Sequence, residues 1–412
     1  MKKHAFYLLS LLLCSACASQ KRELTVTVTN DLSINRAGEV VEVPMDKVNK
    51  LLNLNDSDGV VLYNADGQEI PYQLSYDDKL LFAADVQASA EAVYTIQRGE
   101  PTVQQSVIAY GRAYPERADD MAWENDKVGF RAYGPALQAR GERGFGYDLF
   151  VKRGTSEPVL ESMYALELSP EKWAKHREVA AKDKEAAREL LKTFSYHWDH
   201  GYGMDCYAVG ATLGGGVAAL VESDTIVYPW CYDTEEILDN GPLRFTVKLT
   251  FKPGKVGVDE AVTETRLITL DAGSHLNRTA VSYDGLSKSL PIVAGFALHN
   301  EEPVYEADAN ANYITYVDPT TGPNQGEIYL GAAFPARLAQ AGPVKFTPEE
   351  RKRHSNAFGH LLAQGEYQPG VPFVYYWGFG WNRSDIADAA AWSSYMKEFV
   401  QKMNHPLKVS VK

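Results

Sequence analysis

Hydrophobic and polar positions alternate along most of the chain from residue 24 onward, which is the pattern of half-buried β-strands. Residues 24–29 alternate Leu, Val and Val with Thr, and Asn64-Ala-Asp-Gly67 supplies a hairpin turn. Closely spaced strands with polar turns predict a small β-sandwich. Its predicted strands are 24–29, 40–44, 60–63, 68–73, 80–82 and 92–96.

A stretch richer in Pro, Gly and charge, 99–127, separates this unit from a second and larger set of strands. We therefore expect an N-terminal β-sandwich over 24–106 and a large β-domain over 107–412. Gly214 to Gly216 resembles a hairpin turn. The predicted strands of the larger unit are 128–133, 146–150, 204–212, 216–222, 225–231, 243–251, 263–270, 278–283, 291–299, 312–317, 327–334 and 373–380.

Two segments of the larger unit have the composition of helices. Pro170 opens a charged run over 171–194, whose pattern is typical of a solvated helix. A second helix is expected over 384–403. The predicted fold class is therefore mainly β, a small sandwich followed by a large twisted one with a helical insertion.

The first residues have the layout of a secretory signal. Lys2 and Lys3 precede an apolar run over 6–13, and small residues surround Cys17. Ser15-Ala-Cys17 resembles a bacterial lipobox, although Cys14 stands where Leu is usual, so lipidation at Cys17 and plain cleavage both stay open. We expect residues 1–17 to be a signal peptide and lipobox, and the protein to be exported to the periplasm and held at a membrane by lipid.

Charge and cysteine content narrow the partners. The net charge of −13 argues against nucleic acid and anionic membrane surfaces, which both require basic patches. The 24 Tyr and 7 Trp suit either stacking on sugars or ordinary core packing. Cys206 and Cys231 could form a disulfide in an oxidising compartment or remain two buried thiols.

Several runs resemble the domain-of-unknown-function family 4861. They are Val28-Thr-Asn-Asp-Leu, Val40-Val-Glu-Val-Pro, Gly67-Gln-Glu-Ile-Pro-Tyr-Gln, the segment from Glu116 to Leu137 and Tyr375-Tyr-Trp-Gly-Phe-Gly-Trp. The resemblance implies an exported protein of glycan-degrading bacteria. It also implies a sugar-active supersandwich of the galactose-mutarotase type as the large domain.

The segment 123–133 is the first candidate site. If residues alternate along a strand from Val128, Arg131 and Tyr133 share a face, where a guanidinium suits a carboxylated sugar. Glu124 precedes this strand and is a candidate acid or base, and Trp123 a candidate substrate contact. The alternative is a structural ion pair of Arg131 with Glu124 or Asp126.

The segment 196–207 is the second candidate, because it gathers His, Asp and Tyr around glycines. His197, His200, Asp199 and Tyr207 are candidate catalytic residues, since imidazole is well suited to proton transfer near neutral pH. Trp198 is a candidate substrate contact. The same residues suit a divalent cation or a structural loop, and the spacing does not choose between them.

Isolated residues complete the candidates. His299 and His360 stand at strand ends or between strands and are either catalytic or ordinary core histidines. Arg244, Tyr376 and Trp377 are candidate substrate-binding residues, although a strand of aromatic residues is more often part of a core.

Together with what the resemblance implies, these candidates favour a periplasmic carbohydrate-active enzyme whose partner is a glycan containing uronate. A lyase would use Arg131 or Arg244 to neutralise the carboxylate and a His or Tyr to take the proton. A hydrolase would use two carboxylates among Glu124, Asp126, Asp199 and Asp205. The alternative is a glycan-binding lipoprotein without catalysis.

The lipobox generates the first testable prediction. Intact-mass measurement of protein extracted from membranes should show an acylated Cys17 as the first residue, and Cys17→Ser should release the protein into the soluble fraction. A soluble wild-type product that starts at another residue would contradict lipidation at Cys17.

Overall fold

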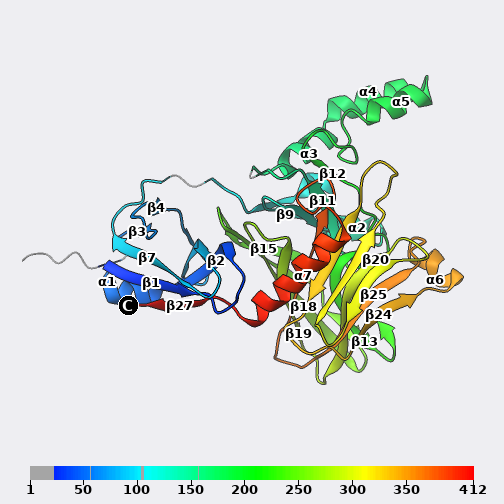
Figure 1. Ribbon diagram of the computed structural model, residues 1–412. Coiled ribbons are helices and arrows are strands. Elements are labelled where there is room, and N and C mark those ends of the chain that lie inside the picture. The colour runs from blue at the N-terminus through cyan, green and yellow to red at the C-terminus, as the bar shows by residue number, and fades with distance from the viewer. Residues whose placement is uncertain (1–22, 56, 104–105, 156) are drawn as a thin grey trace, which may run out of the picture.

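The computed structural model describes residues 23–55, 57–103, 106–155 and 157–412, and Cys17 and the leader lie outside them. Strands dominate, which confirms the mainly β class. Figure 1 shows a smaller lobe, built around β1 (Glu23–Thr29) and β7 (Glu91–Arg98), beside a larger lobe. Helix α7 (Ala389–Asn404) lies next to their junction.

The smaller lobe is a two-layer sandwich. A five-stranded sheet in the order β27-β1-β7-β3-β4 faces a three-stranded sheet, β2-β6-β5. In β1 every second residue is buried, because Leu24, Val26 and Val28 point into one apolar core while the Thr residues face outward. The elements are β1 (Glu23–Thr29), β2 (Arg36–Pro44), α1 (Met45–Leu52), β3 (Val60–Tyr63), β4 (Glu69–Ile70), β5 (Gln73–Leu74), β6 (Lys79–Val86) and β7 (Glu91–Arg98).

The last strand of the chain, β27 (Lys408–Val411), belongs to this smaller lobe. It pairs antiparallel with β1, with Val411 opposite Val26 and Val409 opposite Val28. The sequence placed these residues with the larger unit, because four alternating residues after a helix do not reveal which sheet they will join. The first and last strands of the described chain therefore pair with each other at one edge of the same sheet (Figure 1).

Three sheets build the larger lobe. The largest has nine strands: eight follow the order β15-β16-β18-β19-β26-β23-β22-β21, and the ninth, β17, pairs with β18. The other two sheets have five strands each, in the orders β14-β13-β20-β25-β24 and β12-β11-β10-β9-β8. The strands of the two smaller sheets are β8 (Tyr110–Tyr114), β9 (Asp120–Glu124), β10 (Val128–Ala132), β11 (Asp148–Lys152), β12 (Gly203–Asp205), β13 (Gly215–Glu222), β14 (Thr225–Ile226), β20 (Leu290–Leu298), β24 (Gln340–Lys345) and β25 (Gly359–Tyr367). Those of the nine-stranded sheet are β15 (Thr234–Asn240), β16 (Arg244–Thr250), β17 (Gly254–Val256), β18 (Asp259–Asp271), β19 (Leu276–Asp284), β21 (Val304–Asp308), β22 (Tyr313–Asp318), β23 (Ile328–Ala333) and β26 (Phe373–Trp381).

Buried tryptophans join these sheets. The Trp377 ring stacks on Tyr147 with centroids 4.2 Å apart, and its indole N–H donates to Thr279 Oγ1 at 2.7 Å. Trp123 donates to Asn277 Oδ1 at 2.8 Å. Both indoles are 0% exposed, so the expectation that Trp123 and Trp377 bind substrate is corrected: they fill the core.

The glycine run 214–216, which leads into β13, is part of this core and not a hairpin turn. Gly216 has φ +132°, and a Cβ there would lie 2.8 Å from the Trp377 ring, so only glycine fits. The expected strand over 204–212 ends at Asp205, and the chain then runs irregularly to Gly215, the first residue of β13.

The helices differ from the prediction at their ends. The expected helix over 171–194 is broken in two, because the Asp183 side chain accepts from the N–H groups of Glu185 and Ala186 and starts a new helix. Asp388 likewise caps α7 at Ala391, so that helix starts later than 384. The remaining elements are η1 (Pro115–Arg117), α2 (Pro135–Ala139), α3 (Leu160–Glu167), α4 (Pro170–Ala180), α5 (Lys184–Leu191), α6 (Pro348–Arg353) and α7 (Ala389–Asn404).

Helices α4 and α5 extend away from the larger lobe (Figure 1), and α4 buries none of its residues. By contrast α7 packs Trp392 and Met396 against the sheet beside Tyr313 and Tyr329. Within the described ranges, no helix combines the length and apolarity needed to span a bilayer.

The pairing of β27 with β1 generates the second prediction. Val411 is 7% exposed, so Val411→Ala should lower the local unfolding free energy of the smaller lobe by about 1–3 kcal/mol. Native-state hydrogen exchange of the β1 amides would measure it. Val371→Ala is the control, because Val371 is 58% exposed in a turn. Equal β1 protection in the two variants would show that β27 does not stabilise the sheet.

Candidate functional site

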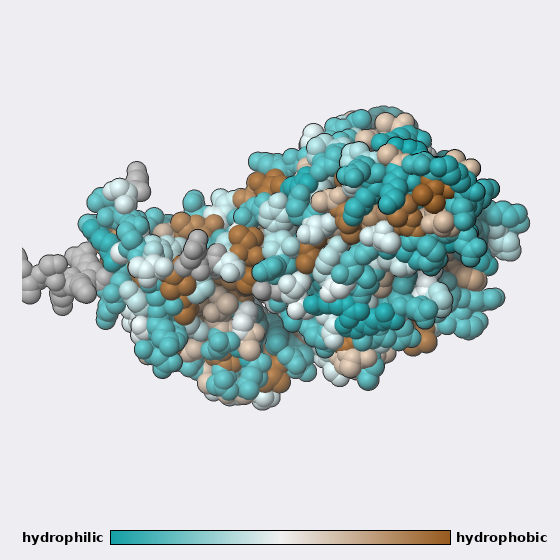
Figure 2. All heavy atoms as spheres, turned by 90° about the horizontal axis from the view of Figure 1, so that it is seen from above, coloured by the Kyte–Doolittle hydropathy of each residue, from teal (hydrophilic) through white to brown (hydrophobic). Residues whose placement is uncertain are grey.

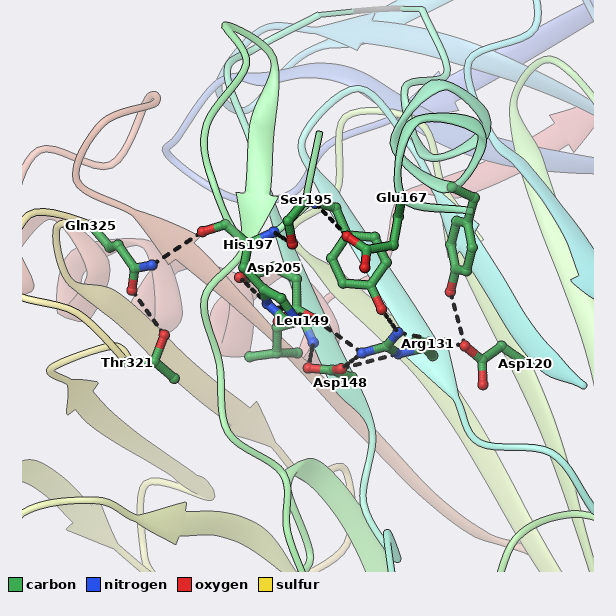
Figure 3. A network of polar contacts seen from close by, with 12 residues as sticks. Asp120, Arg131, Asp148, Leu149, Glu167, Ser195, His197, Asp205, Thr321 and Gln325 are labelled. Carbon is green, nitrogen blue, oxygen red and sulfur yellow. Dashed lines mark hydrogen bonds and ion pairs between the residues drawn. The ribbon is translucent and has the colours of Figure 1, made fainter. Parts of the chain in front are cut away.

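One arginine lies buried at the centre of a polar cluster (Figure 3). Arg131 Nε donates to Asp148 Oδ2 at 3.0 Å, and Nη2 contacts both Asp148 and Asp205, the latter at 3.0 Å. Its Nη1 donates to the Tyr196 hydroxyl at 3.0 Å and lies 3.5 Å from Asp120. Arg131 and the three aspartates are each no more than 3% exposed, so the cluster is closed to water.

Strand alternation builds this cluster. On β10, Phe130 points into the main apolar core, so the next residue, Arg131, points to the other face of its sheet. Asp148 is its direct partner on β11, while Asp120 and Asp205 come from β9 and β12. One guanidinium thus joins four neighbouring strands.

The cluster holds more carboxylates than Arg131 can neutralise. Burial and the nearby Asp148 carboxylate raise the pKa of Asp205 to about 7. Burial also raises the pKa of Asp120, against the opposing charges of Arg131 and Arg117. A proton therefore stays in the cluster well above the pH at which a free aspartate loses it.

His197 connects the cluster to solvent. Its Nδ1 lies 3.1 Å from the Asp205 carbonyl oxygen and 3.6 Å from the Asp205 carboxylate. Because a carbonyl only accepts, Nδ1 carries the proton of the neutral ring, which leaves Nε2 with a lone pair. The side chain is 52% exposed, and Gln325 Nε2 donates to the His197 carbonyl at 3.3 Å (Figure 3).

The other residues of 196–207 have different roles. His200 Nε2 bonds the Ser195 carbonyl at 2.9 Å, and Asp199 pairs with Arg153 while accepting from the N–H groups of Gly201 and Gly203. These contacts lower the pKa of Asp199 and oppose its desolvation. Trp198 is 39% exposed. Asp199 and His200 therefore shape the loop that carries His197.

Glu124 is not part of this cluster. It forms a fully buried ion pair with Lys152, and its Oε1 accepts from the N–H groups of Val159 and Leu160 at 2.9 and 2.8 Å, at the start of α3. An unpaired charge there would cost about 3–5 kcal/mol. The expectation of an acid or base is corrected: Glu124 anchors a helix, and it is not the ion-pair partner of Arg131.

Three further expectations in this first segment are corrected. Tyr133 donates its hydroxyl to Asp148 at 3.0 Å, so it belongs to the cluster rather than to a substrate surface. Asp126 accepts from the Gly273 N–H at 2.6 Å in a turn contact, away from Arg131. Arg131 itself is occupied by aspartates, so its expected contact with a substrate carboxylate is corrected as well.

A second histidine and aspartate pair lies where β20 and β22 end, beside Tyr207 of this loop. His299 Nδ1 bonds Asp318 Oδ2 at 2.6 Å, and although burial opposes it, the Asp318 charge raises the pKa of His299. The buried Tyr207 ring packs edge-on against His299 at 5.1 Å. Sequence reasoning missed Asp318, because nothing in its neighbourhood marks it as a partner for a histidine 19 residues earlier.

His360 is a core histidine and not a catalytic one. It is 0% exposed, its Nε2 accepts from the Leu213 N–H at 3.2 Å, and burial lowers its pKa to about 3. It therefore stays neutral at any pH at which the protein would work.

Arg244 and Tyr376 lie elsewhere, in a cleft of about 1050 Å³ between the two lobes. Arg244 Nε donates to Asp271 at 2.6 Å, and Nη1 donates to Glu42 of the smaller lobe at 2.5 Å. The expectation that Arg244 binds substrate is therefore corrected: its guanidinium connects the two lobes. The structure thus gathers Arg131, His197 and Asp205 in one place. It leaves His299 and His360 outside that cluster, and Arg244 and Tyr376 in the cleft between the lobes.

Cysteines and metal ligands do not build a site in the described part of the chain. Cys206 and Cys231 are both buried and unbridged. No group of three or more His, Cys, Asp or Glu side chains among the described residues is arranged to hold a metal ion. The described residues therefore provide no set of ligands for the divalent cation that the sequence suggested.

The chain resembles known proteins in both sequence and structure. A family model described as "Domain of unknown function (DUF4861)" matches residues 28–409. "Uncharacterized protein P7" of Formosa agariphila is 27% identical over 417 residues, which cover 98% of each chain.

Two solved structures from Enterococcus faecalis also resemble the chain. An α-mannosidase of strain V583 has a TM-score of 0.49 at 8% identity over 95% of this chain, and a glycosyl hydrolase family 38 protein has 0.47 at 7% over 95%. The chain spans only 46% and 47% of their lengths.

The raised pKa of the Asp205 carboxyl generates the third prediction. The folded pKa of Asp205, about 7, lies above that of an unfolded aspartate, so the folded state binds the extra proton. The free energy of unfolding that this proton contributes is complete below about pH 4. It is lost as the pH rises to 7, by at most about 1.4 kcal/mol per pH unit. Asp205→Asn should therefore lose less stability than wild type over that range.

Urea unfolding at several pH values between 4 and 8 measures this difference, and Asp224→Asn, at an exposed turn, is the control. Parallel stability curves for wild type and Asp205→Asn would mean that Asp205 is ionised throughout.

Proposed function

The chain belongs to the DUF4861 family, and from that premise and the geometry at His197 we propose that it is a carbohydrate-active enzyme, a lyase that acts on glycans containing uronate. The observation that carries the proposal is an exposed imidazole whose proton is fixed on Nδ1 by Asp205, beside a carboxyl with a pKa of about 7.

In such a lyase, His197 is the base. Its Nε2 lone pair takes the proton from the carbon next to the sugar carboxylate, a C=C bond forms, and the bond to the glycosidic oxygen breaks. The departing oxygen receives a proton from solvent or from the charged imidazole. Asp205 acts as a positioning residue, because its carbonyl orients the ring and its carboxyl lies 3.6 Å from Nδ1.

The abstraction requires a positive group near the substrate carboxylate. Arg131 is buried and occupied, so Arg153 takes this role in the proposal. Its side chain is 39% exposed, and its partner Asp199 lies two residues after His197 in the same loop. A guanidinium bound on one side by Asp199 still has donors for a second carboxylate.

A hydrolase finds less support in the same geometry. It would require two accessible carboxyl groups on either side of a glycosidic bond. Glu124 is buried against Lys152, Asp199 is paired with Arg153, and Asp205 is 2% exposed. An exposed base without an exposed acid partner therefore favours elimination.

Export and a lipid anchor at Cys17 belong to the proposal, on the strength of the leader sequence. An anchored enzyme would meet oligosaccharides that have entered the periplasm.

The fourth prediction tests the base. The mature protein is incubated with a panel of uronate oligosaccharides, and the absorbance of unsaturated products is followed together with the release of reducing ends. His197→Ala should lower turnover by about 100-fold or more, because general base catalysis contributes about that much. The thermal midpoint should change little, since half of this side chain already faces water.

His405→Ala is the matched control, because His405 is exposed on the segment after α7. Reducing ends without unsaturated product would replace the lyase by a hydrolase. Binding without either product would indicate a glycan-binding protein. Full turnover in His197→Ala would remove His197 from the site.

A further inference from the structure

The cleft between the lobes has a floor and two walls, which come from different parts of the chain. Its floor is the outer face of the nine-stranded sheet, one wall is β2 of the smaller lobe, and the other comprises α7 and the segment that leads to β27. Its volume, about 1050 Å³, is at the upper end for sites that enclose small ligands. The space is therefore large enough for several sugar units.

The floor carries one continuous row of side chains. Thr246 on β16 is the direct partner of Thr269 on β18, which is opposite Arg278 on β19, which is opposite Tyr376 on β26. All four line the cleft. Hydroxyls, a guanidinium and an aromatic ring thus lie side by side, at the spacing of neighbouring strands.

One cationic side chain of the cleft has no ion-pair partner among the described residues. Six cationic and five anionic side chains line it. All of them except Arg278 lie within ion-pair distance of an opposite charge, such as Arg36 with Glu39 and Lys402 with Glu398. Within the described ranges Arg278 makes no ion pair and no side-chain hydrogen bond, although it is half-buried.

We propose that this cleft binds an anionic oligosaccharide, with Arg278 holding a carboxylate or sulfate group and the Tyr376 ring stacking on the adjacent sugar. A planar guanidinium offers paired donors that fit either anion. The half-buried Tyr376 ring packs edge-on against Phe399 of α7, with ring centroids 5.1 Å apart, and this contact fixes its orientation in the cleft. A local excess of positive charge in a protein of net charge −13 selects the charged ligand over neutral ones.

This site is distinct from the loop of His197. Arg278 and Tyr376 lie on the outer face of β19 and β26, whereas their neighbours Asn277 and Trp377 point into the core toward Trp123. Binding at Arg278 therefore does not depend on turnover at His197, and either proposal can fail alone.

The fifth prediction tests the cleft by calorimetric titration of the full mature chain in a His197→Ala background, so that no turnover consumes the ligand. The probes are a galacturonate tetrasaccharide, its full methyl ester and a sulfated galactose tetrasaccharide. At least one anionic probe should bind, and the methyl ester should bind at least about tenfold more weakly than the acid if the carboxylate is the recognised group.

Arg278→Gln should weaken the bound anionic probe at least about tenfold, and Arg278→Lys should restore part of the loss. Tyr376→Leu should weaken both charged and neutral probes. Arg337→Gln is the matched control, because Arg337 is exposed and outside the cleft. The thermal midpoints should agree, since Arg278 has no partner to lose.

Three results would each overturn the proposal. The first is that neither anionic probe binds. The second is equal affinity of Arg278→Gln and Arg337→Gln for a bound anionic probe. The third is a methyl ester that binds as tightly as the acid while the sulfated probe does not bind.

Discussion

The buried guanidinium of Arg131 is the interaction on which the site depends. A cation without water is stable only where carboxylates and other acceptors surround it, and here they come from β9, β11, β12 and Tyr196. The loop that follows α5 is therefore fixed to the small sheet at both of its ends, at Tyr196 and at Asp205. His197 lies between these two anchors, so its position is a consequence of the cluster.

The same cluster has a chemical consequence. Three aspartates around Arg131 compete for its charge, and the burial that closes the cluster penalises every uncompensated carboxylate. The excess is relieved when one carboxyl keeps its proton near neutral pH. A carboxyl with that behaviour lies beside the exposed imidazole of His197, and the primary effect of the cluster is to hold four strands and a loop together.

The sequence predicted much of this because its signals are local. Alternation revealed the strands and placed Arg131 opposite Phe130, and the density of His and Asp pointed to the loop of His197. It did not reveal the partners, because Asp148 and Asp205 lie 17 and 74 residues after Arg131. The alternative interpretation, a structural ion pair, named Glu124 or Asp126 as the partner of Arg131 because both are near in sequence, whereas Glu124 neutralises Lys152.

The same limit applies to the fold as a whole. The pairing of β27 with β1, the Asp318 partner of His299 and the Gly216 contact with Trp377 all join segments distant in sequence. Helix ends depended on caps at Asp183 and Asp388, which are single residues within charged or polar runs. Residue patterns predict elements well, whereas contacts between elements are set by the packed structure.

The nine-stranded sheet separates two surfaces that share the same strands. On β19 and β26, Asn277 and Trp377 face the core, where Trp123 binds Asn277 and extends the contact to β9, the strand that also carries Asp120. Arg278, the residue after Asn277, and Tyr376, the residue before Trp377, face the cleft. Because the side chains of a strand alternate, a one-residue shift of register would exchange the two sets and destroy both surfaces. The tryptophans that fill the core therefore also keep the guanidinium of the cleft facing outward.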